Sequence, residues 1–347
     1  MTFTLLIGLV GATLAAAAGL PAAALIGSSI AVAGLALARL TTDVPPALRQ
    51  LAFLLIGCSM GSGVTPEMLD QAARWPLSLL ILAVTVVLIM LCCGWLLIRC
   101  FDQSLETAAL STSPGALAYA LALATGGIGD ARTIVVIQSV RLLLITTLLP
   151  FILGFLGQPS GPSGAATTAM SGLDLLLVLL PSLVLGLLLT RLRLPAAYLL
   201  AGLLISSIAH YLGLVQGRPP ASILFFGFAI TGTVVGARFS TIPLADLRRL
   251  FGASLLVLLL SVAISAGCAV PVARLLDVPY GQVFVAFAPG GVESMAAMAI
   301  ALHYDPSYVA VHHLFRIFLL MALLPLLFKA NQLRHQQNTT RDGSGGA

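Results

Sequence analysis

The sequence predicts an all-α membrane protein that consists of two homologous halves and crosses the bilayer about 10–12 times. Three observations lead to this prediction: an apolar composition, a repeat at a fixed offset, and a Pro-Gly interruption in one apolar segment of each half. Of the 347 residues, 59% are hydrophobic and only 8% are charged, whereas about 25% are charged in a soluble globular domain. Apolar runs of about 20 residues, the length that spans a hydrocarbon core, recur along the whole chain.

The repeat is clearest in residues 113–150 and 288–325. Aspartates and arginines, which are scarce in this chain, recur there together with prolines at an offset of 175 residues. Several matches at a single offset indicate an internal duplication. The matched pairs are Pro114 and Pro289, Asp130 and Asp305, Arg141 and Arg316, and Pro150 and Pro325.

The duplication divides the chain into a first membrane repeat, a linker, a second membrane repeat and a tail. The linker is rich in Gly, Ser, Pro and Thr and carries no charge, and the tail is polar, so we expect the tail to be disordered. The predicted boundaries are residues 1–156 for the first repeat, 157–172 for the linker, 173–329 for the second repeat and 330–347 for the tail.

The first apolar run, Thr4–Leu20, is expected to be a retained membrane helix. It recurs as Leu173–Leu192, both runs are followed by Pro-Ala-Ala, and no basic residue precedes the first one, as it would in a signal peptide. Further apolar segments are expected at residues 22–39, 47–64, 76–98, 106–125 and 131–156 and, in the second half, at 222–238, 251–275, 281–303 and 306–328.

With a counterpart of residues 22–39 in the second half, the count is six apolar segments per half, and this number raises a question of parity. An even number of crossings leaves the halves parallel, whereas inverted repeats, which are typical of many transporters, need an odd number. Inverted repeats are the arrangement that we predict. They require either that one short segment, such as the interrupted one, does not cross or that a further crossing is hidden.

Paired glycines occur at the same place in both halves. Gly57 and Gly61 lie four residues apart, and Gly232 and Gly236 repeat them at the offset of 175. Glycines at this spacing allow helix backbones to approach closely in lipid. We expect helix packing here, and a role in lining a ligand site stays open.

The interrupted segments predict the binding site. Proline removes a backbone donor and glycine relaxes the backbone, and inside a bilayer the freed polar groups must be satisfied by protein, water or ligand. A broken helix at the same place in both halves is the best sequence-level indication of a transporter site. The residues expected to bind a solute are Pro114, Gly115, Ala116, Arg141, Pro289, Gly290, Gly291, Ser294 and Arg316.

Arg141 and Arg316 each lie near the middle of the last apolar helix of a half. An arginine at that depth costs roughly 2.5–3.5 kcal/mol and persists where it meets a partner or a ligand. One interpretation is that both arginines meet an anionic group or the freed carbonyls of the broken helices. The other is a structural ion pair with Asp130, Asp305 or Glu293.

Four residues are candidates for coupling to protons or cations: Glu293, Asp305, Asp130 and His313. Glu293 follows the second break and has no acidic counterpart in the first half; a salt bridge with Arg316 is the alternative. Each aspartate precedes a helix, where N-terminal capping is the alternative role. His313 lies three residues before Arg316, so a neutral, hydrogen-bonded histidine is the alternative to a proton relay.

Several other classes of function find no support in the residues. The arginines are scattered rather than clustered, which argues against nucleic-acid binding. The five cysteines form no metal-ligand pattern, and no hydrolase, nucleotide or dinucleotide fingerprint is present. We therefore expect no enzyme activity, metal or cofactor. The expected partners are a small-molecule solute and the lipid bilayer, with a homodimer as an open possibility.

The second block resembles the membrane AbrB-like family at Pro289, Gly290, Gly291, Glu293, Asp305, His312, His313, Arg316 and Pro325. The first block departs from it at Ala116, Ala118 and Tyr119, so the second block is expected to perform most of the polar functions. The resemblance covers nearly the whole chain. It implies a fold similar to the cation/proton antiporter and anion transporter superfamily, which uses crossing broken helices. Labels in that family include regulator of gene expression and ammonia monooxygenase.

The function predicted from these residues is a secondary transporter in the inner membrane. It would move a small anionic or zwitterionic solute by alternating access, with proton or cation coupling, and half-helix N-termini and Arg316 would attract the negative charge. The alternative is a membrane-embedded regulator of gene expression that acts through a partner. A membrane oxygenase is a third, weaker alternative, because the chain has no metal-ligand cluster.

Overall fold

The computed structural model describes residues 2–63, 75–115, 117–156 and 168–343. Within these ranges the chain is almost entirely helical, and no strand is longer than the isolated bridge between Ala169 and Arg218. The all-α fold class is confirmed. The helices of the first half are α1 (Thr2–Ala17), α2 (Ala23–Leu37), α3 (Pro46–Gly61), α5 (Trp75–Phe101), α6 (Leu105–Thr112), α7 (Leu117–Thr125) and α8 (Ala131–Phe155).

The second half repeats the same order of elements. Its helices are α9 (Gly172–Arg191), α10 (Ala197–Tyr211), α11 (Ala221–Ala237), α12 (Leu244–Leu276), α13 (Tyr280–Phe287), α14 (Val292–Ala301) and α15 (Pro306–Gly343), with a 3-10 turn η1 (Arg238–Thr241) after α11. The first residues of α6, α7 and α8 precede those of α13, α14 and α15 by the same 175 positions that separate the sequence repeats. The secondary structure therefore follows the duplication element by element.

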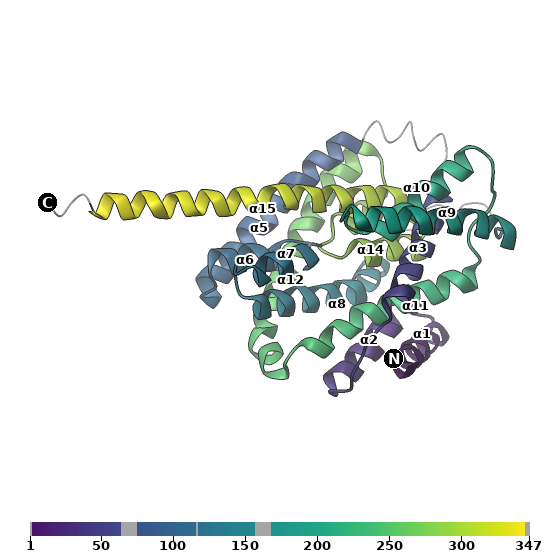
Figure 1. Ribbon diagram of the computed structural model, residues 1–347, viewed down its shortest axis with the longest axis horizontal. Helices are drawn as coiled ribbons and strands as arrows, with labels where there is room; N and C mark the ends of the chain where they lie inside the picture. Colours follow the sequence, from purple (N-terminus) through teal and green to yellow (C-terminus); the bar gives the residue numbers. More distant parts are fainter. Residues whose placement is uncertain (1, 64–74, 116, 157–167, 344–347) are drawn as a thin grey trace.

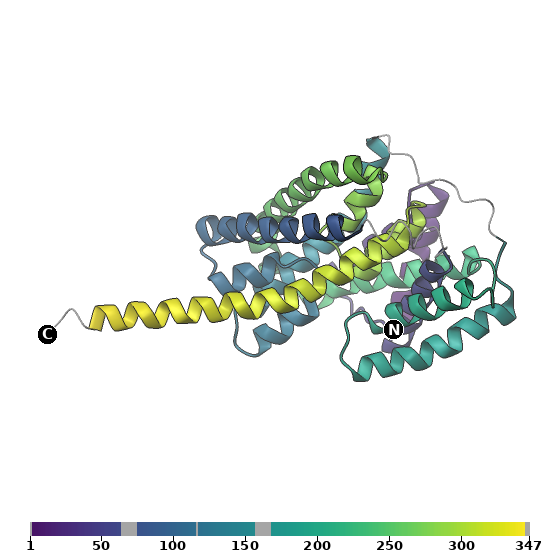
Figure 2. The same ribbon diagram turned by 90° about the horizontal axis from the view of Figure 1, so that it is seen from above.

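The helices form two lobes, and each half contributes to both. The glycine lobe contains α1, α2 and α3 with α9, α10 and α11, and the hairpin lobe contains α5 to α8 with α12 to α15. Figures 1 and 2 show the glycine lobe on the right and the hairpin lobe on the left. The two halves are therefore interlocked rather than side by side.

Helix contacts across the halves hold the glycine lobe together. α3 packs on α10, and α11 packs on α2. The four glycines of the predicted packing motif lie on these contacts, Gly57 and Gly61 against α10 and Gly232 and Gly236 against α2. A Cβ atom on Gly57 would overlap the backbone carbonyl of Leu199, so only glycine permits this approach.

The interrupted segment of each half is a hairpin that returns to the side from which it enters. In the first half, the backbone N–H of Asp130 donates to Oγ1 of Thr107 at 2.9 Å, which joins the exit of α7 to the entrance of α6. In the second half, the N–H of Asp305 donates to Oε1 of Gln282 at 3.0 Å. Both bonds lie at equivalent positions of the duplication. Neither interrupted segment therefore crosses from one side to the other.

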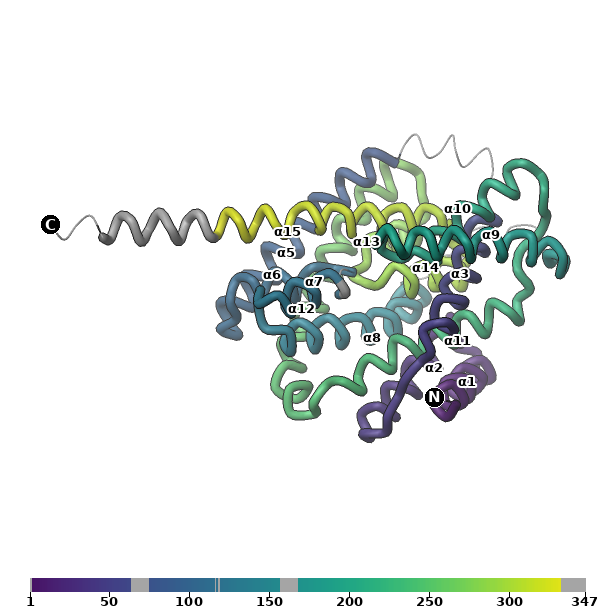
Figure 3. The backbone as a smooth tube through the Cα atoms, in the orientation of Figure 1, coloured from purple at the N-terminus to yellow at the C-terminus, as the bar shows by residue number. Residues whose placement is uncertain are grey.

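The returning hairpins bear on the parity of the repeat. Besides the interrupted segment, the part of each half that the structure describes has five other apolar helices, which is an odd number. The two hairpins extend toward each other from opposite directions, as the positions of α6–α7 and α13–α14 in Figure 3 show, and their tips meet at Gly115 and Gly290. Opposed hairpins at equivalent sequence positions require the inverted arrangement.

Six described helices are long and apolar enough to cross a membrane, which supports a multi-pass membrane protein. They are α5, α8, α9, α11 with η1, α12 and the first part of α15. The helices α1, α2, α3 and α10 are apolar but have 15 or 16 residues. At 1.5 Å per residue they reach about 22–24 Å, less than a typical core of about 30 Å. The predicted 10–12 crossings therefore depend on these shorter helices.

The predicted disorder of the tail, residues 330–347, stays a prediction. The backbone of α15 is helical from Pro306 to Gly343 and so continues past the predicted start of the tail. Figure 1 shows this part of α15 extending beyond the rest of the molecule. Residues 157–167 of the predicted linker, and Ala116 of the predicted site, lie outside the described residues.

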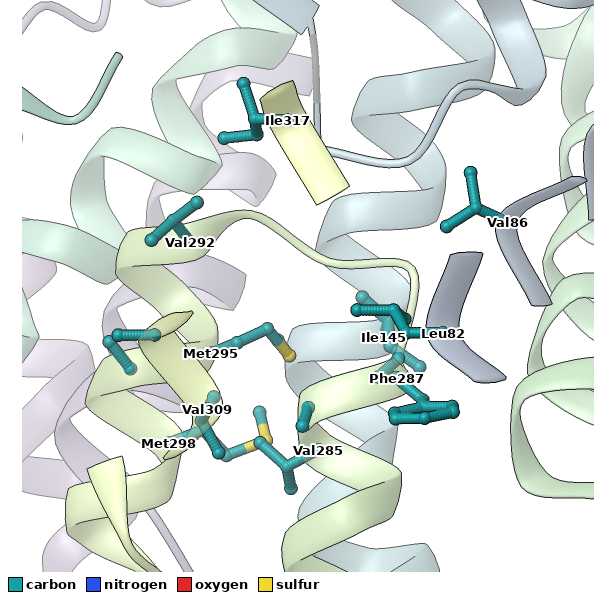
Figure 4. Close-up of a cluster of buried hydrophobic side chains, with 14 of the residues drawn as sticks. Leu82, Val86, Ile145, Val285, Phe287, Val292, Met295, Met298, Val309 and Ile317 are labelled. Carbon is teal, nitrogen blue, oxygen red and sulfur yellow. The ribbon is translucent and has the colours of Figure 1, made fainter. Parts of the chain in front are cut away.

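A continuous hydrophobic core supports the second hairpin. Figure 4 shows Phe287 of α13 and Met295 of α14 among buried residues from α5, α8 and α15. Ile317 of α15 and Ile145 of α8 belong to the same core. This packing fixes the tip of α13–α14 relative to the two helices that carry the buried arginines.

Candidate solute-binding site

Arg141 crosses from α8 to the tip of the first hairpin. Its Nη1 donates to the carbonyl of Thr112 at 3.1 Å, and its Nη2 donates to the carbonyl of Ser113 at 3.0 Å. These carbonyls end α6, where the last turn of a helix lacks intrahelical partners. The guanidinium therefore caps the broken helix and offsets the negative end of its dipole.

Arg316 does the same for the second hairpin. Its Nη1 and Nη2 donate to the carbonyls of Ala288 and Gly290, both at 2.7 Å. The two arginines thus meet the freed carbonyls of the broken helices, as one interpretation predicted. Among the described residues their hydrogen bonds do not go to Asp130, Asp305 or Glu293, so the ion-pair alternative is not what the structure contains.

Both guanidiniums are deeply buried and retain an unused donor. Arg141 is 2% exposed and Arg316 is 1% exposed. In each, Nε is buried and has no hydrogen-bond partner among the described residues. A buried, unpaired N–H is unfavourable by about 1–3 kcal/mol, so a ligand that accepts from it would be stabilised.

Gln138 and His313 occupy equivalent positions and make equivalent bonds. Nε2 of Gln138 donates to the carbonyl of Leu110 at 2.6 Å, and Nε2 of His313 bonds the carbonyl of Val285 at 3.1 Å. Nδ1 of His313 accepts from Arg316, which places the histidine hydrogen on Nε2. Both ring nitrogens are engaged, so this geometry favours the hydrogen-bonded role over a relay.

The hairpin tips touch at a glycine. Gly115 has a φ of +78°, which L side chains rarely adopt. A Cβ atom there would lie 2.8 Å from Nη2 of Arg316 and 3.1 Å from the carbonyl oxygen of Gly290. Arg316 therefore reaches both tips, and glycine is required where they meet.

A cavity of about 180 Å³ lies beside these tips, at the boundary between the two lobes. The hairpin lobe contributes residues of both hairpins and of the two arginine helices, and the glycine lobe contributes the turn before α10 and the start of η1. The lining residues are Gly115, Leu117, Gln138, Arg141, Leu142, Pro289, Gly290, Gly291, Val292, Glu293 and Ile317, with Pro195, Ala196 and Arg238 from the glycine lobe.

The N-terminus of α14 opens into this cavity. Its N-cap residue, Gly291, supplies no side-chain cap, and Gly291, Val292 and Glu293 all line the cavity. The first backbone N–H groups of a helix lack intrahelical partners and carry partial positive charge. Together with Arg141, they form a site that suits an anionic group.

Glu293 and Ser294 have different environments although they are adjacent. Glu293 is partly exposed and lines the cavity, whereas Ser294 is 2% exposed and its Oγ donates to the carbonyl of Gly291 at 3.1 Å. The serine hydroxyl therefore completes the first turn of α14. Glu293 is the acidic group that faces the cavity.

Asp130 and Asp305 lie at the bases of the hairpins rather than at the tips. Each caps the helix that follows: Asp130 accepts from the N–H groups of Arg132 and Thr133, and Asp305 accepts from those of Ser307 and Tyr308. The capping alternative therefore describes their contacts, and the cavity is about ten residues, or about 15 Å, farther along each helix.

Sequence reasoning missed part of the cavity. Gln138 lies three residues before Arg141 on α8, and Leu142 lies one residue after it. Nothing in the sequence distinguished these two residues as part of a site. Arg238 ended a predicted apolar segment and gave no indication of a site. Pro195 and Ala196 were noticed only as a repeated Pro-Ala-Ala. The lobe arrangement brings these residues together, and no sequence pattern shows it.

The comparison with protein families concerns the sequence that forms this site. Residues 24–332 match the family model described as "Transition state regulatory protein AbrB". The chain belongs to the AbrB family. The predicted resemblance is confirmed, and the matched region of this AbrB-family chain contains both hairpins, both buried arginines and the whole cavity lining.

Two curated proteins are similar to this AbrB-family chain over most of its length, at low sequence identity. "Putative regulator AbrB" of Escherichia coli (strain K12) is 26% identical over 313 residues, covering 89% of each chain. "Uncharacterized protein YhjN" of Bacillus subtilis (strain 168) is 23% identical over 309 residues, covering 84% of this chain and 80% of its own. Both similarities extend across the two halves of the AbrB duplication.

Proposed function

We propose that this protein is a secondary transporter of the inner membrane that carries a small anionic or zwitterionic solute. One observation supports it most directly: the open N-terminus of α14 and the buried Arg141 face the same cavity, with an unused Nε–H on the arginine. A helix N-terminus alone is a weak indication, but a desolvated guanidinium with a free donor is a second, independent one.

The cavity bounds the size of the solute. Its volume is about 180 Å³. An apolar cavity of roughly 150 Å³ can hold benzene, so a solute of a few carbon atoms is the right size. Macromolecular cargo is too large for this site.

The position of the cavity suits alternating access. It lies between two lobes, and inverted repeats allow such lobes to exchange two equivalent packings. In this proposal, the hairpin lobe carries the solute while the glycine lobe supplies the opposing wall. Glu293, which lines the same cavity, is the coupling group, because its protonation would change the charge that the solute meets.

The test is flux in proteoliposomes that contain the purified protein. We expect accumulation of at least one radiolabelled small organic acid or amino acid, with a rate that depends on an imposed pH gradient. Arg141→Gln should abolish the flux. Arg132→Gln is the matched control, because Arg132 lies on the same helix but is exposed, and it should retain the flux. Equal rates in both variants would show that the site is misassigned.

A second candidate follows from the printed names of the family and of one relative, which describe regulators. A membrane-embedded regulator would use the same cavity to sense a solute and pass the signal to a partner. It predicts solute binding without flux, and a regulatory phenotype that Arg141→Gln removes. Flux above that of empty liposomes contradicts a purely regulatory role.

A further inference from the structure

Arg238 begins η1, where the glycine lobe reaches the cavity. The equivalent position in the first half is Gly63, so the duplication does not repeat this charge. Glu293 also lacks a charged counterpart, because Ala118 occupies the equivalent position. Two charges that break the duplication therefore line one cavity, from two different lobes. This convergence indicates that the cavity, rather than either repeat, is the specialised feature.

The charges at the cavity do not balance. Arg141, Arg238 and Glu293 line it, and Arg316 reaches the tip glycine at its edge. Three positive groups and one negative group leave a formal charge of +2 around the cavity, and two of the positive groups, Arg141 and Arg316, are only 2% and 1% exposed. Carbonyl dipoles offset part of this charge for Arg141 and Arg316 but add no negative ion. A net charge in a low-dielectric site is unfavourable unless a ligand compensates for it.

The cations also occupy two distinct positions. Arg141 lies with the open end of α14 in the hairpin lobe, whereas Arg238 belongs to the glycine lobe. Arg141 retains an unused Nε–H beside the tip carbonyls, and a guanidinium such as that of Arg238 can hold a carboxylate through two parallel N–H donors. An anion with a single charged group could occupy only one of these positions and would leave one formal positive charge around the cavity without compensation.

We propose that the solute is a small dianion, with the short dicarboxylates as its organic class. One carboxylate lies against Arg141 and the N-terminus of α14, and the other lies against Arg238. Glu293 attracts Arg238 electrostatically, and the second carboxylate of the solute replaces that attraction. Arg238 thus determines specificity for a second negative charge. The assignment uses the site of the proposed transporter, but it concerns binding and is tested without flux.

Three molecules with the same four-carbon chain separate the charge classes. Succinate carries two negative charges, butyrate carries one, and 4-aminobutyrate is a zwitterion. Binding to the purified protein is measured by calorimetry and by the shift of its melting temperature. We expect succinate to bind most tightly. Equal or tighter binding of butyrate or 4-aminobutyrate overturns the proposal, and so does the absence of succinate binding at about millimolar concentration, the weak end of specific binding.

Variants of Arg238 test its role. Arg238→Gln should weaken succinate binding about ten-fold or more and leave butyrate binding nearly unchanged. Arg49→Gln is the matched control, because Arg49 also acts electrostatically on Arg238 but is exposed and does not line the cavity. Arg238→Lys keeps the charge without the planar fork and should give an intermediate loss. An unchanged succinate affinity in folded Arg238→Gln protein contradicts the assignment.

The binding and flux experiments fail independently. Selective succinate binding without flux of any solute would leave the dianion assignment intact and remove the transporter proposal. Flux of a monoanion without succinate binding would do the reverse.

Discussion

The two hairpins have the same internal frame, by which we mean the hydrogen bonds at the tip and at the base of each hairpin, but their surroundings differ. In both, an arginine ten residues into the following helix donates to the carbonyls at the tip, and an aspartate at the base caps that helix. In both, the residue three positions before the arginine bonds an equivalent carbonyl. This frame depends on polar side chains that the duplication preserved or replaced with other hydrogen-bonding groups, as in Gln138 and His313.

Burial separates the two hairpins. On α14, Ala297 and Met298 are fully buried at 0% exposure. On α7, the equivalent Ala122 is exposed and Leu123 is only partly buried. α14 packs against α3 of the glycine lobe as well as against helices of its own lobe. The same local fold is therefore covered differently in the two halves, which is the asymmetry that the proposed alternating access needs from inverted repeats.

The largest effect is expected from removing a buried arginine. Arg316→Ala leaves the carbonyls of Ala288 and Gly290 without their donors and empties a filled volume, so we expect a loss of about 3–5 kcal/mol in unfolding free energy. Arg141→Ala should lose a similar amount if the two frames are equivalent. For Arg132→Ala, an exposed control, the unfolding free energy should stay within about 0.5 kcal/mol of the wild-type value. Denaturant unfolding in detergent measures all three.

A large loss in only one arginine variant would contradict the equivalence of the frames. It would mean that one hairpin owes its conformation to lobe packing instead of to its arginine. In that case the buried hairpin, α13–α14, is the one that should tolerate the substitution.

A smaller but more selective effect is expected in cysteine labelling. In a variant without the native cysteines, Ala122→Cys should react rapidly with a water-soluble maleimide, whereas Ala297→Cys should react several-fold more slowly, because Ala297 is fully buried. Any solute or condition that moves the lobes should change the two rates in opposite directions. Rates that are equal, or that rise and fall together, would show that the difference in burial does not report a two-state movement.

The sequence predicted the frame better than the site. The matched prolines, aspartates and arginines located both tips. The demand for buried partners left two interpretations of Arg141 and Arg316 open, and the contact with freed carbonyls is the one that the structure contains. The return of the hairpin could not be deduced, because an interrupted apolar segment has the same composition whether it crosses or turns back. The contribution of Arg238 depends on how the lobes meet, and the contrast between α7 and α14 depends on packing that equivalent sequences do not encode. Prediction therefore failed where tertiary contacts between the lobes decide the environment.

The smallest effect compares the two capping aspartates. For Asp130, burial raises the pKa, but hydrogen bonds from the Thr133 side chain and from the N–H groups of Arg132 and Thr133 outweigh it, and the pKa is lowered from its ordinary value. For Asp305, burial prevails over the N–H bonds from Tyr308 and Ser307, and the pKa is raised. The ionised form of Asp130 therefore stabilises the fold, and the ionised form of Asp305 destabilises it.

Asparagine substitutions isolate these charges, because asparagine also caps helices well. Asp130→Asn should lower stability near neutral pH, and this difference should vanish as the pH falls below the unfolded value of 3.8 and through the lowered pKa. Asp305→Asn should instead be neutral or stabilising near neutral pH. The difference in unfolding free energy from wild type should vanish as the pH falls through the raised pKa of Asp305 toward the unfolded value of 3.8. Because Asp130 is exposed, we expect its effect to be below about 1 kcal/mol. The free energy of unfolding of each variant, compared with that of the wild type from about pH 3 to about pH 7, measures these differences. If the two variants change the stability in the same direction near neutral pH, the bases of the two hairpins share one environment. The asymmetry would then be confined to α7 and α14.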